Sequence, residues 1–233
     1  MNGRVYRVRR MVAVVVAAVS LVAVLLSSAD LWQPVSNQQV SPEGDLTGSA
    51  AAMLETVEVK GRAPKTGYER TQFGDGWNII DGCDTRNRIL YRDLSGATIS
   101  EDCKVLSGTL ADPYTGKIIS FKRGANTSDA VQIDHVVALS NAWQTGAQQL
   151  DSATREKLAN DPLELLAVEG KANQEKSDGD AATWLPSNKM FRCQYVARQI
   201  AVKAKYRLWM TPAEKDVIER VLSTCPGQTV PSR

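Results

Sequence analysis

The sequence predicts an α+β domain, mainly helical and with few strands, in which two strands are followed directly by a helix. Residues 131–137 (VQIDHVV) are apolar and β-branched, which is typical of a strand, and residues 163–168 (LELLAV) form a second apolar run of strand length. Gly170 ends that run, and the polar residues 171–178 after it favour a helix. Together the three segments predict a β-β-α unit.

The segments around this unit are mostly helical in pattern. The last helix begins at Pro212, because Thr211 and Glu214 have the spacing of a capping box. A turn is expected at 112–116 (DPYTG), where proline and glycine reverse the chain. The remaining predictions are a short helix or strand at 87–94, a strand at 117–121, and helices at 141–149, 152–160 and 186–207.

Residues 1–29 have the pattern of an export signal. Four arginines precede an uncharged apolar run at 11–26, and small residues follow at 27–29. The run is shorter than the roughly 20 residues of a membrane-spanning helix, which favours a cleaved signal peptide over an uncleaved signal anchor. In both cases the rest of the chain lies outside the cytoplasm, either secreted or anchored by this helix.

The rest of the chain is expected to be a linker followed by one domain. Residues 30–56 are rich in Ser, Gly, Gln and Pro without an apolar period, so we expect a disordered linker there and a monomeric folded domain at 57–233. Without residues 1–29 the chain has 24 Lys+Arg against 26 Asp+Glu. Its overall field therefore does not attract nucleic acid, and any such binding requires a local basic patch.

One stretch offers such a patch. Between Asp180 and Glu214 there are six basic residues and no acid, with aromatic residues interleaved. Arg192 and Lys203, both in this stretch, are candidates for contacts with a phosphate backbone. The alternative is an ordinary helix with a basic outer face and an aromatic core face, because the aromatic residues have helical spacing.

Four cysteines in an exported chain indicate two disulfides. Three pairings are possible, and we favour Cys83 with Cys103 and Cys193 with Cys225, because each closes a short local loop. A zinc site made of the four cysteines is the less favoured alternative, because the sequence contains no C-x₂-C pair.

His135, the only histidine, directly follows Asp134 inside a predicted strand. Adjacent side chains of a strand point to opposite faces, so the two reach one site only where the strand gives way to a loop. The alternative is a structural Asp–His pair at a strand end.

An ordered series of motifs extends on both sides of this pair. It comprises CDTRN at 83–87, RDL at 92–94, DPYTG at 112–116, QIDHVV at 132–137, NDP at 160–162, LLAV at 165–168, Asn173, Lys176, Asp178 and WLP at 184–186. On these motifs the chain, from about Tyr68 to Tyr206, resembles the HNH endonucleases of the ββα-metal (His-Me finger) superfamily. More closely, it resembles an exported bacterial family with a GmrSD-type HNH domain.

The resemblance implies a metal-dependent endonuclease with little sequence specificity, acting on DNA, with RNA as the alternative substrate. His135 would be the general base for water, a role that suits an imidazole because its ordinary pKa is near neutrality. Asp134 and Asn173 would hold one divalent cation, Mg²⁺ or Mn²⁺, through oxygen ligands. Lys176 would reach a phosphate, with a solvated helix lysine as the alternative, and Arg86 is a further candidate for substrate contact.

Glu164 departs from the family pattern, which has asparagine at the start of the second strand. That asparagine steadies the loop carrying the catalytic histidine, so Glu164 takes its place in the candidate catalytic set. A glutamate can accept a hydrogen bond from a backbone N–H or an imidazole, but it lacks the amide donor. The alternative function is therefore a catalytically weakened HNH-fold protein at the cell surface that binds nucleic acid or a protein partner.

Overall fold

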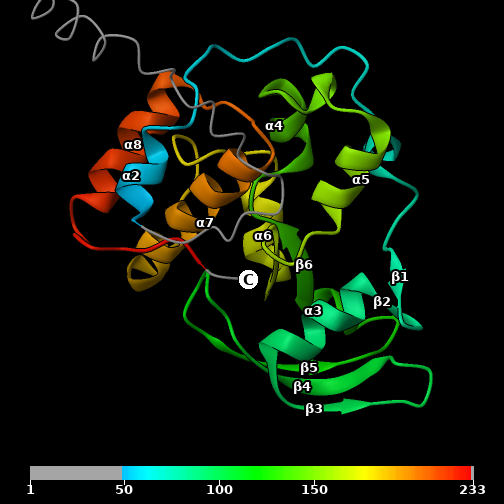
Figure 1. Cartoon of the computed structure of the whole chain (residues 1–233). Helices are drawn as coiled ribbons and strands as arrows, with labels where there is room; N and C mark the ends of the chain where they lie inside the picture. Colours follow the sequence, from blue (N-terminus) through cyan, green and yellow to red (C-terminus); the bar gives the residue numbers. More distant parts are fainter. Residues whose placement is uncertain (1–48, 232–233) are drawn as a thin grey trace, which may run out of the picture. The chain divides into compact units, whose positions relative to one another are not determined.

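The computed structural model describes residues 49–231 of the 233-residue chain (Figure 1). The expected export signal at 1–29 and most of the expected linker lie outside the described residues. Within 49–231 the chain is a mixed α and β structure, with three small antiparallel sheets. The strands are β1 (Ile79–Ile80), β2 (Cys83–Asp84), β3 (Leu94–Ile99), β4 (Val105–Ala111), β5 (Ile118–Lys122), β6 (Val131–His135) and β7 (Leu165–Glu169).

The helices account for the larger part of the described fold. They are α2 (Ala50–Leu54), α3 (Thr85–Asp93), α4 (Leu139–Gln144), α5 (Ser152–Ala159), α6 (Gly170–Lys176), α7 (Arg192–Lys205) and α8 (Pro212–Leu222). Short 3₁₀ turns occur at Arg70–Phe73, Ser128–Ala130, Ala147–Gln149 and Lys189–Phe191. The capping box predicted for the last helix is present, with Thr211 and Glu214 bonded to each other's backbone.

The expected β-β-α order is formed by β6, β7 and α6. The two strands pair antiparallel, with His135 opposite Leu165 and Val131 opposite Glu169. Helix α6 begins at the residue after β7 and packs against both strands. Gly170 permits the Ser128–Ala130 segment to approach the start of α6 closely, because a Cβ atom there would lie 2.0 Å from the Asp129 carbonyl oxygen.

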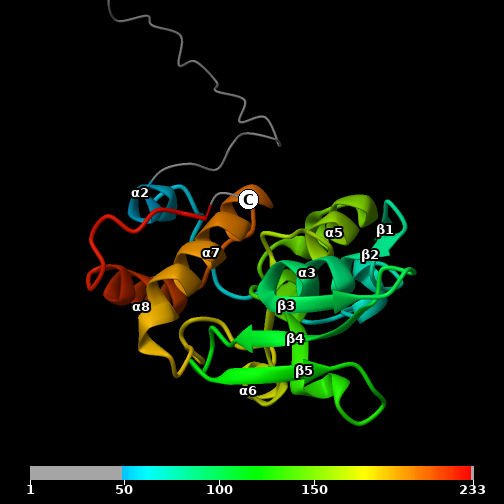
Figure 2. The same ribbon diagram turned by 90° about the horizontal axis from the view of Figure 1, so that it is seen from below.

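A second layer is built on the three-stranded sheet β3–β4–β5. Helix α3 lies between this sheet and the β6–β7 pair (Figures 1 and 2). Their shared core contains Leu90, Phe121, Val131 and Leu165, all buried. The segment at 87–94 is thus a helix, begun by the Asp84 side chain, which accepts from the Asn87 backbone N–H.

Strands β3 and β4 were not predicted from the sequence. Their sequences, LSGATI and VLSGTLA, are rich in Ser and Gly and lack a clean alternation. The register between them also shifts at Ser95/Thr98 and Thr98/Ile99. A bulged pair with one exposed face buries too few apolar side chains to leave a period of two in the sequence.

The folded region begins earlier than expected, since α2 falls inside the segment assigned to the linker. Helix α2 packs on α7 and α8 (Figures 1 and 2). Its Ala50 and Leu54 side chains are 0% and 2% exposed, and Val57 is also buried. Residues four apart share one helix face, and this single turn is too short to show as a period in a polar segment.

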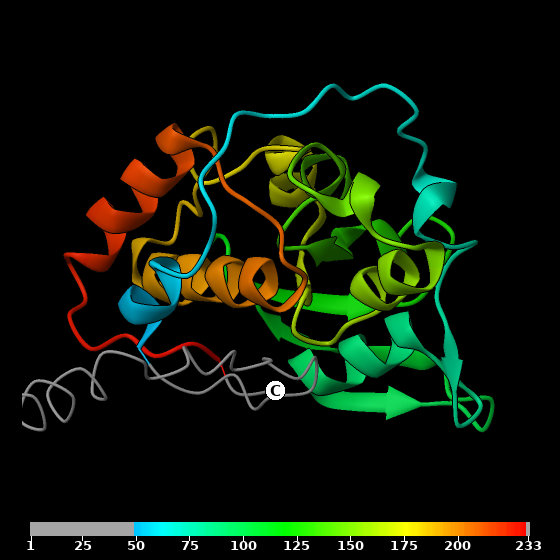
Figure 3. The ribbon, with the colours of Figure 1, turned by 45° about the horizontal axis from the view of Figure 1, so that its top comes forward.

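The segment between α2 and β1 runs along α4 before it reaches β1 (Figure 3). The Ala63 N–H donates to the Gln144 carbonyl, and the Trp143 indole N–H donates to the Thr66 carbonyl. Within residues 49–231 no helix is both long and apolar enough to cross a bilayer.

Both predicted disulfides are present, joining Cys83 to Cys103 and Cys193 to Cys225, with Cα–Cα distances of 5.4 and 6.4 Å. The first ties β2 to the turn between β3 and β4, and the second ties the start of α7 to the end of the helix α8 region. The four-cysteine zinc site is therefore ruled out, because all four thiols are used.

We expect the double substitution Cys193→Ser with Cys225→Ser to lower the free energy of unfolding by about 3 kcal/mol, because the bridge closes a loop with a sequence separation of 32 residues. Guanidinium denaturation of the double variant and the oxidised parent measures the difference. Parent protein unfolded under reducing conditions is the control, and equal midpoints for oxidised parent and variant would contradict the expectation.

Candidate active site

A cleft of about 550 Å³ opens beside the β6–α6 contact. It brings together four of the residues selected from the sequence: Asp134, His135, Asn173 and Arg86. The cleft is also lined by residues of the segment before β1, notably Lys65, Arg70 and Trp77.

Two parallel contacts join β6 to α6 and form one wall of the cleft. Gln132 and Asp134 are two residues apart and share a strand face, while Asn173 and Lys176 are three apart and share a helix face. The Asn173 amide N–H donates to Gln132 Oε1 at 2.9 Å, and Lys176 Nζ donates to Asp134 Oδ1 at 3.0 Å. The Asn173 amide and the Asp134 carboxylate are therefore neighbours on facing surfaces.

Asp134 is held by two donors although it is almost completely buried. The Tyr114 hydroxyl donates to Oδ2 at 2.5 Å, and Lys176 Nζ donates to Oδ1. Burial raises the pKa of Asp134, and the adjacent Lys176 ammonium opposes that rise. Each carboxylate oxygen has two lone pairs, so these bonds leave acceptor capacity on the side that lines the cleft.

Lys176 is not where the sequence analysis placed it. Its side chain is 0% exposed, and Nζ donates both to Asp134 and to the His135 carbonyl oxygen at 2.8 Å. Both expectations, a phosphate contact and a solvated helix lysine, are corrected by this geometry. A buried ammonium is tolerated only with such partners, so Lys176 is an internal counter-ion of Asp134.

His135 has its tautomer fixed by the backbone. Its Nε2 lies 3.0 Å from the Ala159 carbonyl oxygen, and because a carbonyl only accepts, Nε2 carries the hydrogen in the neutral ring. The lone pair is then on Nδ1, which makes no hydrogen bond within residues 49–231. Nδ1 is also not one of the fully enclosed polar atoms without a partner, so it keeps some access to solvent.

The imidazole of His135 is kept neutral by its surroundings. Burial, and after it the nearby Arg70 guanidinium, lower the pKa of His135 to about 3. The Trp77 ring stacks on the imidazole, with centroids 5.7 Å apart and planes inclined by 5°. The ring orientation is therefore set by two contacts, with Ala159 and with Trp77.

Glu164 lies behind the loop that follows His135 and does not line the cleft. Its side chain is completely buried, and Oε2 accepts from the Val137 N–H at 3.1 Å. The Glu164 carbonyl also accepts from the Val136 N–H at 2.8 Å. Burial raises the pKa of Glu164 well above its ordinary value. Glu164 therefore positions the loop as a hydrogen-bond acceptor, and neither touches substrate nor faces solvent.

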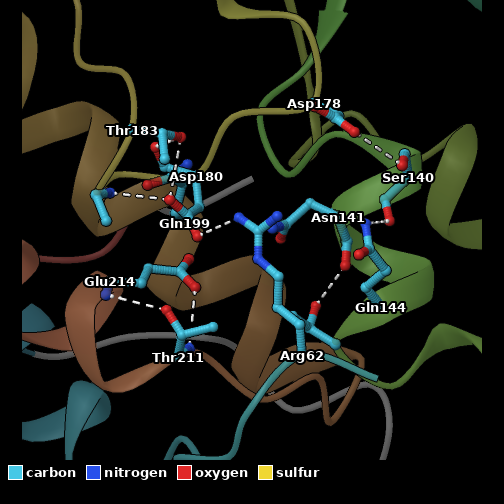
Figure 4. A network of polar contacts seen from close by, with 12 residues as sticks. Arg62, Ser140, Asn141, Gln144, Asp178, Asp180, Thr183, Gln199, Thr211 and Glu214 are labelled. Carbon is cyan, nitrogen blue, oxygen red and sulfur yellow. Dashed lines mark hydrogen bonds and ion pairs between the residues drawn. The ribbon is translucent and has the colours of Figure 1, made fainter. Parts of the chain in front are cut away.

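The basic stretch at 181–213 does not line the cleft. Lys203 is completely buried, with Nζ 2.9 Å from Glu214 Oε1 and 2.9 Å from the Trp209 carbonyl oxygen. Glu214 is the residue that caps α8 with Thr211 (Figure 4). Arg192 donates to the Pro186 carbonyl at 2.8 Å, away from the cleft. The expected substrate contact of Lys203 is thus wrong, and the aromatic core face is confirmed, since Trp209 is buried. The contact expected of Arg192, a half-buried residue outside the cleft, stays a prediction.

Three cleft residues were missed from the sequence because they belong to no motif. Arg70 has an exposed side chain that makes no hydrogen bond or ion pair within residues 49–231, and it lies beside His135. Lys65 pairs with Asp178 at 3.2 Å, and Asp178 also accepts from the Ser140 hydroxyl (Figure 4). Trp77 is the third. The only sequence signal for these residues is that Phe73 and Trp77 flank two glycines, a pattern typical of an ordered loop.

Comparison with known proteins finds a matching family and a related protein. A family model described as the C-terminal domain of GmrSD restriction endonucleases matches residues 84–221. A protein of Arthroderma benhamiae, described as an uncharacterized secreted protein, is 33% identical over 211 residues, which cover 90% of this chain and 97% of that protein. No solved structure matches the chain. Arg70 and Trp77 precede the range that the family model matches.

We expect Lys203→Met to lower the free energy of unfolding by about 3–5 kcal/mol, because it leaves the Glu214 carboxylate buried without its partner. Urea denaturation measures the loss. Lys189→Met, at an exposed lysine of the same stretch, is the matched control and should leave stability nearly unchanged. If the two variants were equally stable, Lys203 would not be buried against Glu214, and it would again be a candidate for substrate contact.

The low pKa of His135 makes stability fall as the solution is acidified. The unfolded chain binds a proton at His135 near its ordinary pKa of 6.5, whereas the folded chain does so only near 3, so acid favours unfolding between these values. Each pH unit in that window removes up to about 1.4 kcal/mol. We expect the stability advantage of the parent over His135→Gln to shrink by roughly 2 kcal/mol between neutral pH and pH ~4.5. Parallel pH curves from urea denaturation would show that the imidazole titrates normally.

Proposed function

Because this chain belongs to the family of GmrSD restriction endonuclease C-terminal domains, we propose that it is an exported, metal-dependent endonuclease that hydrolyses phosphodiester bonds of nucleic acid. The observation that carries the proposal is the neutral His135 imidazole, which lines the cleft together with Asp134 and Asn173 and whose Nδ1 has no hydrogen-bond partner within residues 49–231. In this proposal β6, β7 and α6 are the ββα-metal motif.

In the proposed reaction His135 accepts one proton. Nδ1 accepts a proton from the water whose oxygen attacks phosphorus, and the bond from phosphorus to the leaving oxygen breaks. The Ala159 carbonyl stabilises the resulting imidazolium, because it already accepts from Nε2. Arg70 and Arg86 bind the phosphate. An anionic phosphate beside the ring raises the pKa of His135 from its low value toward the range useful to a general base.

The donor set of the cleft fits one hard divalent cation, Mg²⁺ or Mn²⁺. The Asn173 amide nitrogen donates to Gln132, which leaves the Asn173 amide oxygen for another partner. Asp134 retains acceptor capacity. Residues 49–231 bring no three His, Cys, Asp or Glu side chains together, so water and phosphate oxygens would complete the ligand shell. When bound, the cation would supply Lewis-acid stabilisation of the phosphate and the leaving oxygen.

The position of Glu164 favours the enzyme over the alternative of a catalytically weakened binding protein. Its carboxyl accepts from the Val137 N–H and so holds the loop after His135, the task of the asparagine that it replaces. Two disulfides and the secreted relative support export to an oxidising compartment. The substrate proposed is DNA, with RNA as the alternative.

We expect the purified domain to nick plasmid DNA in the presence of Mg²⁺ or Mn²⁺, and His135→Ala to lower the rate by about 10²–10⁴-fold, the usual contribution of a general base. His135→Gln, which keeps a polar side chain beneath Trp77, should lose activity to a similar extent. Lys189→Ala, a basic residue away from the cleft, is the control and should cut like the parent.

Circular dichroism and urea denaturation establish that the His135 variants fold. Two results would sink the proposal: a parent that cuts with neither cation at neutral pH, or a folded His135→Ala variant that cuts as fast as the parent.

A further inference from the structure

A second depression, of about 260 Å³, adjoins the cleft. The two share Arg70, Trp77, His135 and Leu139, so the imidazole and the indole form the partition between them. The rest of its wall comes from Ala159 and from the segment Thr71 to Gly76. Whatever occupies the second depression therefore lies next to the reacting centre of the proposed nuclease.

The two depressions differ in chemistry. The cleft is lined by charged and amide side chains, whereas the second depression has the apolar walls of Phe73, Trp77 and Leu139. Phe73 and Leu139 belong to the buried core, at 2% and 4% exposure, so this wall is rigid. Asp75, at its rim, carries a negative charge. Arg70 also lines the depression, so its charge opposes that of Asp75, and the apolar wall favours a flat uncharged group.

We propose that this depression receives one unpaired nucleobase of the strand being cut, and that the enzyme therefore prefers single-stranded nucleic acid to duplex. The inference rests on the proposed nuclease function. With a phosphate bound by Arg70 in front of His135, the nucleoside attached to it lies at the partition, within reach of the apolar wall. In a duplex that base is paired and stacked, and it must first leave the helix, which costs free energy that a single strand does not pay.

The depression does not follow from family membership. The segment Arg70 to Trp77, which supplies most of its wall, precedes residues 84–221, the range matched by the family model. This segment is held in place by its own contacts: Arg155 donates to the Gln72 carbonyl at 2.7 Å, and Asn160 accepts from the Asn78 N–H at 2.9 Å. Most of the base-binding wall thus lies outside the range of the family match.

The first test uses the parent protein and Mg²⁺ with a single-stranded oligodeoxynucleotide that carries one abasic position. The linkages beside the missing base should be cut at least about fivefold more slowly than the same linkages in the intact strand, the lower limit of what stacking on an aromatic ring contributes. The intact duplex should also be cut more slowly than the strand. Equal cutting with and without the base, or faster cutting of the duplex, overturns the proposal.

The second test measures binding without cutting. In EDTA, fluorescence anisotropy compares a labelled oligothymidylate with an abasic strand of equal length. The abasic strand should bind at least about fivefold more weakly, and equal affinities overturn the base pocket. If the parent cuts nothing but still binds bases preferentially, the nuclease proposal fails while the pocket stands. If it cuts both strands equally, the nuclease proposal stands and the pocket fails.

A pair of variants ties the effect to this depression. Thr71 is exposed and lines only the second depression, so Thr71→Phe should fill it and abolish the difference between intact and abasic strands. Thr66→Phe makes the same substitution at an exposed residue outside both depressions and should keep the difference. If Thr71→Phe binds and cuts with the full preference for intact strands, the base lies elsewhere and the assignment is wrong. Should Thr71→Phe fail to fold, the abasic comparison on the parent decides.

Discussion

The buried ion pair between Lys176 and Asp134 is the constraint on which the candidate site depends. The Lys176 side chain is 0% exposed and that of Asp134 only 6%, and breaking such a pair by removing one partner leaves a charge uncompensated in the interior. The pair therefore fixes α6 against β6. Asn173, one turn earlier on the helix, is thereby set beside Gln132. Because Nζ also binds the His135 carbonyl, the same ammonium fixes the backbone at the histidine.

The chemistry of His135 comes from residues that are distant in the chain. Ala159, at the end of α5, selects the tautomer, and Trp77, before β1, holds the plane of the ring. Glu164 then steadies Val136 and Val137, the two residues after His135, by accepting from their backbone N–H groups. Each contact is weak alone, but together they fix ring orientation, tautomer and loop position, which is what general-base catalysis requires of a side chain. The site thus depends on the packing of several segments around one strand end.

The sequence was informative where local patterns dominate. The β-β-α order, the two cysteine pairs and the capping box at Thr211 were predicted. The ordered motifs also selected Asp134, His135 and Asn173, which line one cleft in the structure. It failed where the partner of a charge is set by tertiary structure. Lys176 and Lys203 resemble solvated helix lysines, yet their carboxylates, Asp134 and Glu214, are found only in the folded chain. Helix α2 and the strands β3 and β4 were missed because their apolar patterns are too short.

The charge balance determines how substrate is captured. Residues 30–233 carry a small excess of acid, and two cations near the cleft are already paired, Lys65 with Asp178 and Lys176 with Asp134. Long-range attraction of nucleic acid is therefore weak, and capture must come from contacts made at the site. In the proposed reaction Arg70 would bind the phosphate, with Asp134 holding the cation, but salt screens such charges. An apolar surface for a base is not screened in this way, so in the proposed exported nuclease Trp77 and Phe73 would add affinity that ionic strength does not remove.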